Sequence, residues 1–230
     1  EDGLYSISFN YKAVDTGTTS MEISFAIDGK YAFGDAEKLV LPRIWQDDKE
    51  KRYDGIGNQI STNLVTYDTL YDYTLTDTYD SGEPYAFYLS SGVHEISVTP
   101  VSGSFYLEKI TFEGTKQISA YFKPENGEMY SGETIVLEAE EAIIKTDYSL
   151  VGKSDNASAK ITPNNTKFQR INYIGGQNWQ DAGETIVLET PKLKAGYYSI
   201  GFSFRQNTVL NGVTYRMPSS ACKDPFKEAA

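Results

Sequence analysis

The sequence predicts an all-β fold, a sandwich of two antiparallel sheets, and three observations support this expectation. Apolar and polar residues alternate with a period of two in many short segments, which is typical of strands with one buried face. Stretches rich in Gly, Asp and Ser separate these segments and indicate turns. Helical patterns are scarce, so a second sheet is the natural cover for the apolar strand faces.

The expected elements follow in chain order. A first strand is expected at residues 5–11, where Tyr5, Ile7, Phe9 and Tyr11 fall on one face. A second is expected at 23–27, ahead of the turn signal "IDGK". Further alternating segments are 84–103, 104–115, 133–140, 183–190 and 197–204, with a hairpin turn indicated at 90–98. Only 36–41 and 224–230 suit a helical turn or two.

Composition limits the possible partners. The chain has 230 residues, enough for one large core or two small ones, and a net charge of −11. That charge argues against nucleic acid, because phosphates would be repelled. No run approaches the roughly 20 apolar residues of a membrane-spanning helix, so no membrane insertion is expected. Cys222 is the single cysteine, which excludes an intrachain disulfide.

An internal repeat relates the two ends of the chain. "GLYSISFNYKA" begins at Gly3 and "GYYSIGFSFRQ" begins at Gly196, 193 positions later. The same offset relates "YAFGDA", ending at Ala36, to "DPFKEA", ending at Ala229. A register held over about 34 positions predicts two copies of one module.

The repeat predicts tandem modules cut out of phase. Residues 1–114 would be the C-terminal two-thirds of a first module, 115–132 a linker, and 133–230 the N-terminal part of a second. A sandwich that lacks strands exposes edges and half its core. We therefore expect residues 133–195 to complete the first sandwich in permuted order. Residues 196–230 would then be surplus, poorly packed, or paired with another molecule.

Several motifs resemble a known group of modules. "LEAEEAIIKTD", "INYIGGQNWQDAGETIVLET", "GYYSIGFSFRQN" and "LPRIWQDD" are similar, in this combination, to galactose-binding-like jelly-roll sandwiches. Such modules include carbohydrate-binding modules of families 6, 35 and 36. The set most resembles modules attached to extracellular solute-binding proteins of sugar-type ABC importers in Firmicutes. The resemblance implies a Gram-positive cell-surface location, a carbohydrate ligand and an importer solute-binding domain as a possible partner.

The resemblance also implies a structural calcium ion. Members of these families hold calcium with the glutamates of a Glu-Ala-Glu motif, which here are Glu138 and Glu140, and with a carboxylate of the final strand, here Glu108. Calcium takes six to eight oxygen ligands, and alternate residues of a strand share a side. The alternative is an acidic, solvated strand end.

Two tryptophans are the first candidates for sugar contacts. Sugar recognition combines an aromatic face with polar groups for the hydroxyls. Trp179 lies in "GGQNWQDAG" and Trp45 in "LPRIWQDD". Arg205 and Asn207 follow an aromatic strand, and Tyr71 lies in a tyrosine-rich segment. For each residue, a role in the core or in fixing a loop is the alternative.

No catalytic motif is evident in the sequence. Glutamates spaced by two could mimic a glycosidase pair but bring no cleft. His94 is the only histidine, and no nucleophile elbow accompanies it. The expected function is therefore a non-catalytic carbohydrate-binding module of an extracellular, sugar-uptake-associated protein. The alternative is a structural spacer or protein-docking sandwich without sugar affinity.

Overall fold

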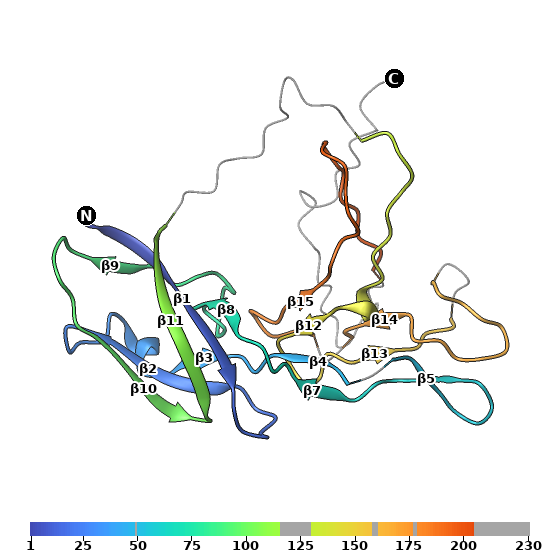
Figure 1. Ribbon diagram of the computed structural model, residues 1–230, viewed down its shortest axis with the longest axis horizontal. Helices are drawn as coiled ribbons and strands as arrows, with labels where there is room; N and C mark the ends of the chain where they lie inside the picture. The colour runs from blue at the N-terminus through green and yellow to red at the C-terminus, as the bar shows by residue number, and fades with distance from the viewer. Residues whose placement is uncertain (49, 116–129, 158–160, 177–178, 205–230) are drawn as a thin grey trace, which may run out of the picture. The chain divides into compact units, whose positions relative to one another are not determined.

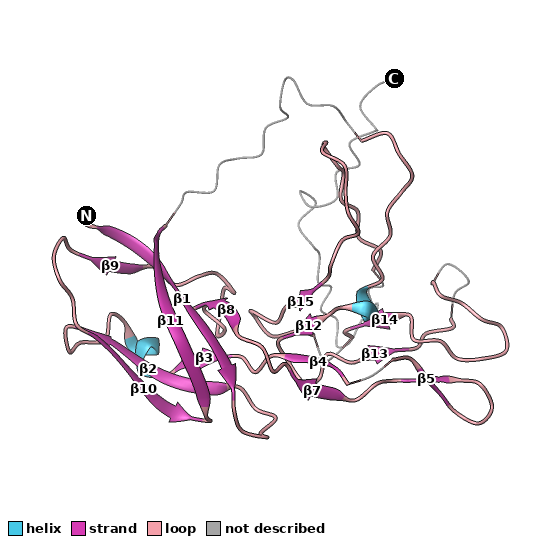
Figure 2. Ribbon diagram, in the orientation of Figure 1, coloured by secondary structure: helices cyan, strands magenta, loops and turns pink. Residues whose placement is uncertain are grey.

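The computed structural model describes residues 1–48, 50–115, 130–157, 161–176 and 179–204, coloured in Figure 1. Over these ranges the fold is all-β, as predicted: the strands pair antiparallel and only two short 3-10 helices occur (Figure 2). The chain forms two compact units. Unit 1 comprises the described parts of Glu1–Lys123 and Glu133–Leu193, and unit 2 those of Pro124–Gly132 and Lys194–Ala230.

Two antiparallel sheets of unit 1, here called the sandwich, share one core. The first has the order β11-β1-β8, with β9 also paired to β1, and the second has the order β10-β2-β3. The bounds are β1 (Gly3–Ala13), β2 (Met21–Ile27), η1 (Gly34–Glu37), β3 (Leu39–Leu41), β8 (Tyr71–Thr74), β9 (Phe87–Leu89), β10 (Ile96–Ser102) and β11 (Phe105–Gly114).

The core lies between these sheets and is aromatic. Ile7, Phe9 and Tyr11 of β1 are fully buried, which confirms the face that the alternation predicts. Phe9 lies 6.0 Å, between ring centroids, from Phe25 of β2, whose ring meets Phe87 of β9 edge-on. Side chains of both sheets therefore bury each other, as in a β-sandwich.

A two-residue turn closes β2. Ile27 and Lys30 exchange backbone hydrogen bonds, and Asp28 and Gly29 between them have φ values of 52° and 71°. This is the conformation that an Asp-Gly pair adopts most readily in a hairpin turn. The Asp28 carboxylate also accepts a 2.7 Å hydrogen bond from Nδ1 of His94, which secures the turn to the segment before β10.

One local expectation is wrong, and another is met only in part. Residues 90–98 do not close a hairpin, because β9 pairs with β1 in one sheet and β10 with β2 in the other. They carry the chain between sheets. Residues 36–41 leave the short helix η1 at Glu37 and enter β3, because Leu39 and Leu41 alternate into the core beside Met21 and Ile23.

A third sheet of unit 1 combines strands from distant parts of the chain. Its order is β15-β12-β4-β7, and two strand pairs, β5-β6 and β13-β14, lie outside it. The bounds are β4 (Trp45–Asp47), β5 (Arg52–Tyr53), β6 (Gln59–Ile60), β7 (Leu64–Thr66), η2 (Ala139–Glu141), β12 (Ile144–Lys145), β13 (Gly152–Lys153), β14 (Tyr173–Ile174) and β15 (Ile186–Val187).

Residues 133–193 belong to unit 1. Their strands β12 and β15 pair with β4 and with each other, not with a strand of the sandwich. The fully buried Lys145 of β12 reaches both carboxylate oxygens of Asp47 on β4 at 2.9 Å. This ion pair connects two segments that lie 98 positions apart. The module boundaries stay a prediction.

Two predicted strands differ in the structure. Residues 133–138 form no strand, and Ile135, Val136 and Leu137 are exposed. The segment alternates in sequence, but no strand of the described chain pairs with it. The strand expected at 183–190 is only Ile186–Val187, where it meets β12. Alternation is therefore insufficient without a partner.

Unit 2 has no strand among its described residues. Segment 194–204 contains the second copy of the β1 motif, and Ile200, Phe202 and Phe204 are 82%, 85% and 61% exposed. Tyr130 and Tyr198 stack with centroids 4.5 Å apart, and the Tyr130 amide donates to the Tyr197 carbonyl at 2.9 Å. The strand predicted at 197–204 is therefore not formed in the structure.

No helix in the described ranges has the length and apolarity to cross a membrane.

Candidate functional site

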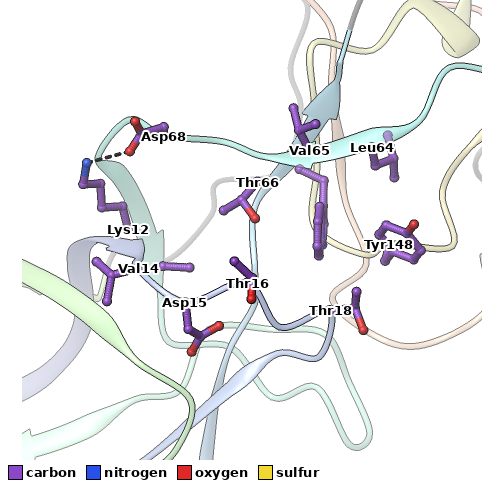
Figure 3. A pocket seen from close by; sticks show the side chains of 12 residues that line it. Lys12, Val14, Asp15, Thr16, Thr18, Leu64, Val65, Thr66, Asp68 and Tyr148 are labelled. Atoms are coloured by element: carbon purple, nitrogen blue, oxygen red, sulfur yellow. Dashed lines mark hydrogen bonds and ion pairs between the residues drawn. The ribbon is translucent and has the colours of Figure 1, made fainter.

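An open hollow of about 540 Å³ lies where the end of β1 approaches β4 and β7 (Figure 3). Three segments surround it: the end of β1 with the loop that follows, the β4-β7 pair with Asp68, and the loop after β12. Thr16, Thr66 and Tyr148 come from three different segments and are labelled in Figure 3. The hollow is lined by Lys12, Ala13, Val14, Asp15, Thr16, Thr18, Trp45, Leu64, Val65, Thr66, Asp68 and Tyr148.

Two aromatic rings form one wall of the hollow. Trp45 lies in the middle of the third sheet, opposite Thr66 of β7 and Lys145 of β12, and is only 4% exposed. Tyr148 is 47% exposed and meets Trp45 edge-on, with 4.8 Å between centroids. The buried tryptophan therefore supports the tyrosine, whose ring is the accessible surface.

Arg43 fixes the loop 14–19 that forms the opposite side. Its side chain is 2% exposed and forms an ion pair with the Asp15 carboxylate. It also donates to the Asp15 carbonyl at 3.0 Å and to the Thr19 carbonyl at 3.2 Å. Gly17 gives this contact room, because a Cβ there would lie 3.2 Å from the guanidinium, which is a tight distance. A buried arginine thus holds an exposed loop from beneath.

Charges around the hollow are paired. Lys12 and Asp68 form an ion pair at 2.7 Å, and this contact holds the pKa of the Asp68 carboxyl below its usual value. Backbone amides of Gly17 and Ser104, followed by the Arg43 contact, lower the pKa of Asp15. Both carboxylates are therefore ionised at neutral pH, and each has a cationic partner.

The third sheet beneath the aromatic wall contains a polar cluster. Asp47 accepts hydrogen bonds from Lys145 and, at 2.6 Å, from the Thr62 hydroxyl. Lys145 is the β12 residue paired with Trp45 in the sheet. The cluster therefore ties the segment that carries Tyr148 to the strand that carries Trp45.

The structure distributes the predicted sugar-binding residues widely. Trp45 lines the hollow but is nearly buried. Trp179 is 39% exposed and lies outside the hollow, with its indole N–H donating to the Glu184 carbonyl at 3.1 Å. Tyr71 pairs with Tyr11 across β8 and β1 and is partly buried, which raises its pKa. Arg205 and Asn207 lie outside the described residues.

Sequence reasoning missed Tyr148, Thr16 and Thr18, which come from loops. "KTDYS" carried a usable signal, an aromatic residue among polar neighbours, whereas nothing in "DTGTT" indicates that Arg43 holds it. The contact between Arg43 and Asp15, which lie 28 positions apart in the sequence, forms that side of the hollow.

The predicted calcium ligands belong to two different elements. Glu108 is exposed on β11, and Glu138 and Glu140 lie at η2. Burial and the neighbouring Glu138 and Glu141 carboxylates raise the pKa of Glu140. The ranges that the structure describes contain no group of three or more acidic, His or Cys side chains placed to hold a metal. Calcium stays a prediction.

The comparisons with known proteins give no match. No family model, no curated protein and no solved structure matches the chain.

Proposed function

We propose that this chain is a non-catalytic carbohydrate-binding β-sandwich module whose ligand occupies the hollow beside Tyr148. The observation that carries the proposal is the exposed tyrosine ring, supported by buried Trp45 and surrounded by threonines and paired charges. A sugar ring needs an aromatic surface for its C–H groups and hydrogen-bonding groups for its hydroxyls. Both lie within one hollow of suitable size.

The charge balance favours a neutral sugar. Lys12 pairs with Asp68 among the lining residues, and the buried Arg43 pairs with Asp15 from beneath, so each carboxylate at the hollow already has a cationic partner. A uronate would meet the two carboxylates, and the ammonium group of an amino sugar would compete with cations that already engage them. Neutral hydroxyls can share the lone pairs and N–H groups that these pairs leave available.

A binding role without turnover agrees with the state of the carboxylates. A glycosidase needs one carboxylic acid that stays protonated near neutral pH. Asp15 and Asp68 have lowered pKa values instead, so neither is suited to donate a proton. An extracellular location and association with a sugar importer rest on the sequence resemblance alone.

A glycan array followed by calorimetry tests the proposal. We expect binding to neutral glycans, weakened at least about tenfold by Tyr148→Ala, because loss of an aromatic anchor costs more than about 1.4 kcal/mol. Tyr88→Ala is the matched control, since Tyr88 is 63% exposed and lies outside the hollow. Arrays read with and without calcium test the predicted ion.

Two results would count against the proposal. Silence across all glycans would favour the spacer or docking alternative. Loss of binding on Trp179→Ala, with Tyr148→Ala unaffected, would move the site to the loop before β15.

A further inference from the structure

The second copy of the β1 motif has the sequence of a core strand but not its surroundings. Over nine positions, 3–11 and 196–204, five residues are identical. Ile7, Phe9 and Tyr11 are fully buried, whereas their counterparts Ile200, Phe202 and Phe204 are mostly exposed. Three large apolar side chains exposed at alternate positions of one segment are unusual, and they indicate an interaction surface.

The fold shows which strand receives a sequence of this type. β1 pairs with β11 antiparallel over nine residue pairs, from Tyr5–Gly114 to Ala13–Phe105. β11 is the end strand of its sheet, and among the described residues it pairs with β1 alone. Its outer edge therefore offers a row of backbone donors and acceptors that can pair with another strand.

The rim beside that edge is partly apolar. Tyr106 and Phe112 of β11 are 54% and 37% exposed, and Val101 at the end of β10 is 50% exposed. A strand added next to β11 extends the sheet and places one of its faces toward the second sheet. Ile200, Phe202 and Phe204 have the spacing to line that face, as Ile7, Phe9 and Tyr11 do in β1.

We propose that segment 196–204 of one molecule adds as a strand to the outer edge of β11 in a second copy of this chain. The occupant is a second copy because the same polypeptide carries both the β1-type strand and β11, whose inner edge already pairs with such a strand. Segment 195–204 has no charged residue, so strand addition buries no unpaired charge from the donor. Reciprocal donation between two molecules gives a closed dimer.

Light scattering after size exclusion, under reducing conditions because of Cys222, tests this inference with the full chain. We expect a mass of 25.7 kDa at low concentration and twice that value as concentration rises between about 1 and about 200 µM. Phe202→Asp should abolish the shift. Ile56→Asp is the matched control. Ile56 is 74% exposed in a turn of unit 1, so this substitution should leave the dimer intact.

Hydrogen exchange gives an independent readout. Amides of 197–204 and the β11 amides that face away from β1 should gain protection in the dimer. An excess of the peptide GYYSIGFSF should lower the dimer fraction. A monomer at every concentration, or a dimer that survives Phe202→Asp, would overturn the proposal.

Discussion

Residues 3–11 and 196–204 share one sequence motif and have different structures. The first forms a strand with neighbours on both sides and a buried apolar face. The second belongs to unit 2, forms no strand and exposes the same apolar positions. Alternation therefore specifies which face of a strand can be buried, whereas partner strands decide whether the strand forms.

The largest expected effect compares equivalent phenylalanines. Phe9→Ala should lower the free energy of unfolding by about 3–5 kcal/mol, because it leaves a cavity between the sheets. Phe202→Ala should change it by less than about 0.5 kcal/mol in the monomer, because the side chain is already exposed. Urea denaturation at low protein concentration measures both. Equal losses would contradict the comparison.

A chimera in which the second copy of the motif replaces the first tests more closely whether the two copies are equivalent. Replacing residues 7–11 by the sequence of 200–204 should preserve the sheet and cost about 2–4 kcal/mol. Three residues change. Tyr11→Phe removes a 2.5 Å hydrogen bond to the Pro42 carbonyl, and Ser8→Gly removes a 2.9 Å contact with Thr74. Asn10→Ser shortens a buried side chain whose Oδ1 has no hydrogen-bond partner, so it contributes less to the cost. Denaturation and circular dichroism provide the measurement. An unfolded chimera would show that the motifs are not equivalent.

The turn after β2 is the next difference between the copies. The second copy has Cys222 where the first has Gly29, whose φ is 71°. Gly29→Ala should cost about 1 kcal/mol through backbone strain alone, since a Cβ there meets nothing within 4 Å. Gly34→Ala, also unobstructed and without a positive φ, is the control. Thermal unfolding compares the two variants.

The smallest expected effect depends on pH. Hydrogen bonds to the Ser90 carbonyl and to Asp28 raise the pKa of His94 above its usual value of about 6.5. A group whose pKa is raised in the folded state contributes its full stabilisation at pH values below its unfolded-state pKa. This contribution is lost as the pH rises through the folded-state pKa. Stability should therefore decline slightly on going from pH 6 to pH 8. His94→Gln should flatten that part of the profile; an unchanged slope would contradict the assignment.

Much of the sandwich is predictable because its buried residues alternate. Tyr5 to Tyr11, the "IDGK" turn and the aromatic core positions follow from local pattern. The third sheet is not predictable in this way, since β4 and β12 are three and two residues long and are held by the distant Lys145–Asp47 pair. Such short strands carry too little sequence to show a period.

The candidate site likewise combines a feature that the sequence predicts with features that depend on distant contacts. Trp45 is recognisable as an aromatic residue among polar neighbours, yet burial leaves Tyr148 as the accessible ring. Arg43, two positions before Trp45 in the sequence, donates a hydrogen bond to Asp15, which lies in a loop 28 positions earlier. A hollow formed by three segments depends on contacts that residue spacing does not encode.

The pairing of β1 with β11 has a consequence for biosynthesis. The central strand of the sheet is made first, but its partner follows roughly 100 residues later, so at 5–20 residues per second β1 waits roughly 5–20 s on the ribosome. During that interval β1 depends on β8 and β9, which emerge earlier. The second copy of the motif, which begins at Gly196, is made only after β11, which ends at Gly114. Order of translation therefore favours the first copy as the internal strand and leaves the later one available to another molecule.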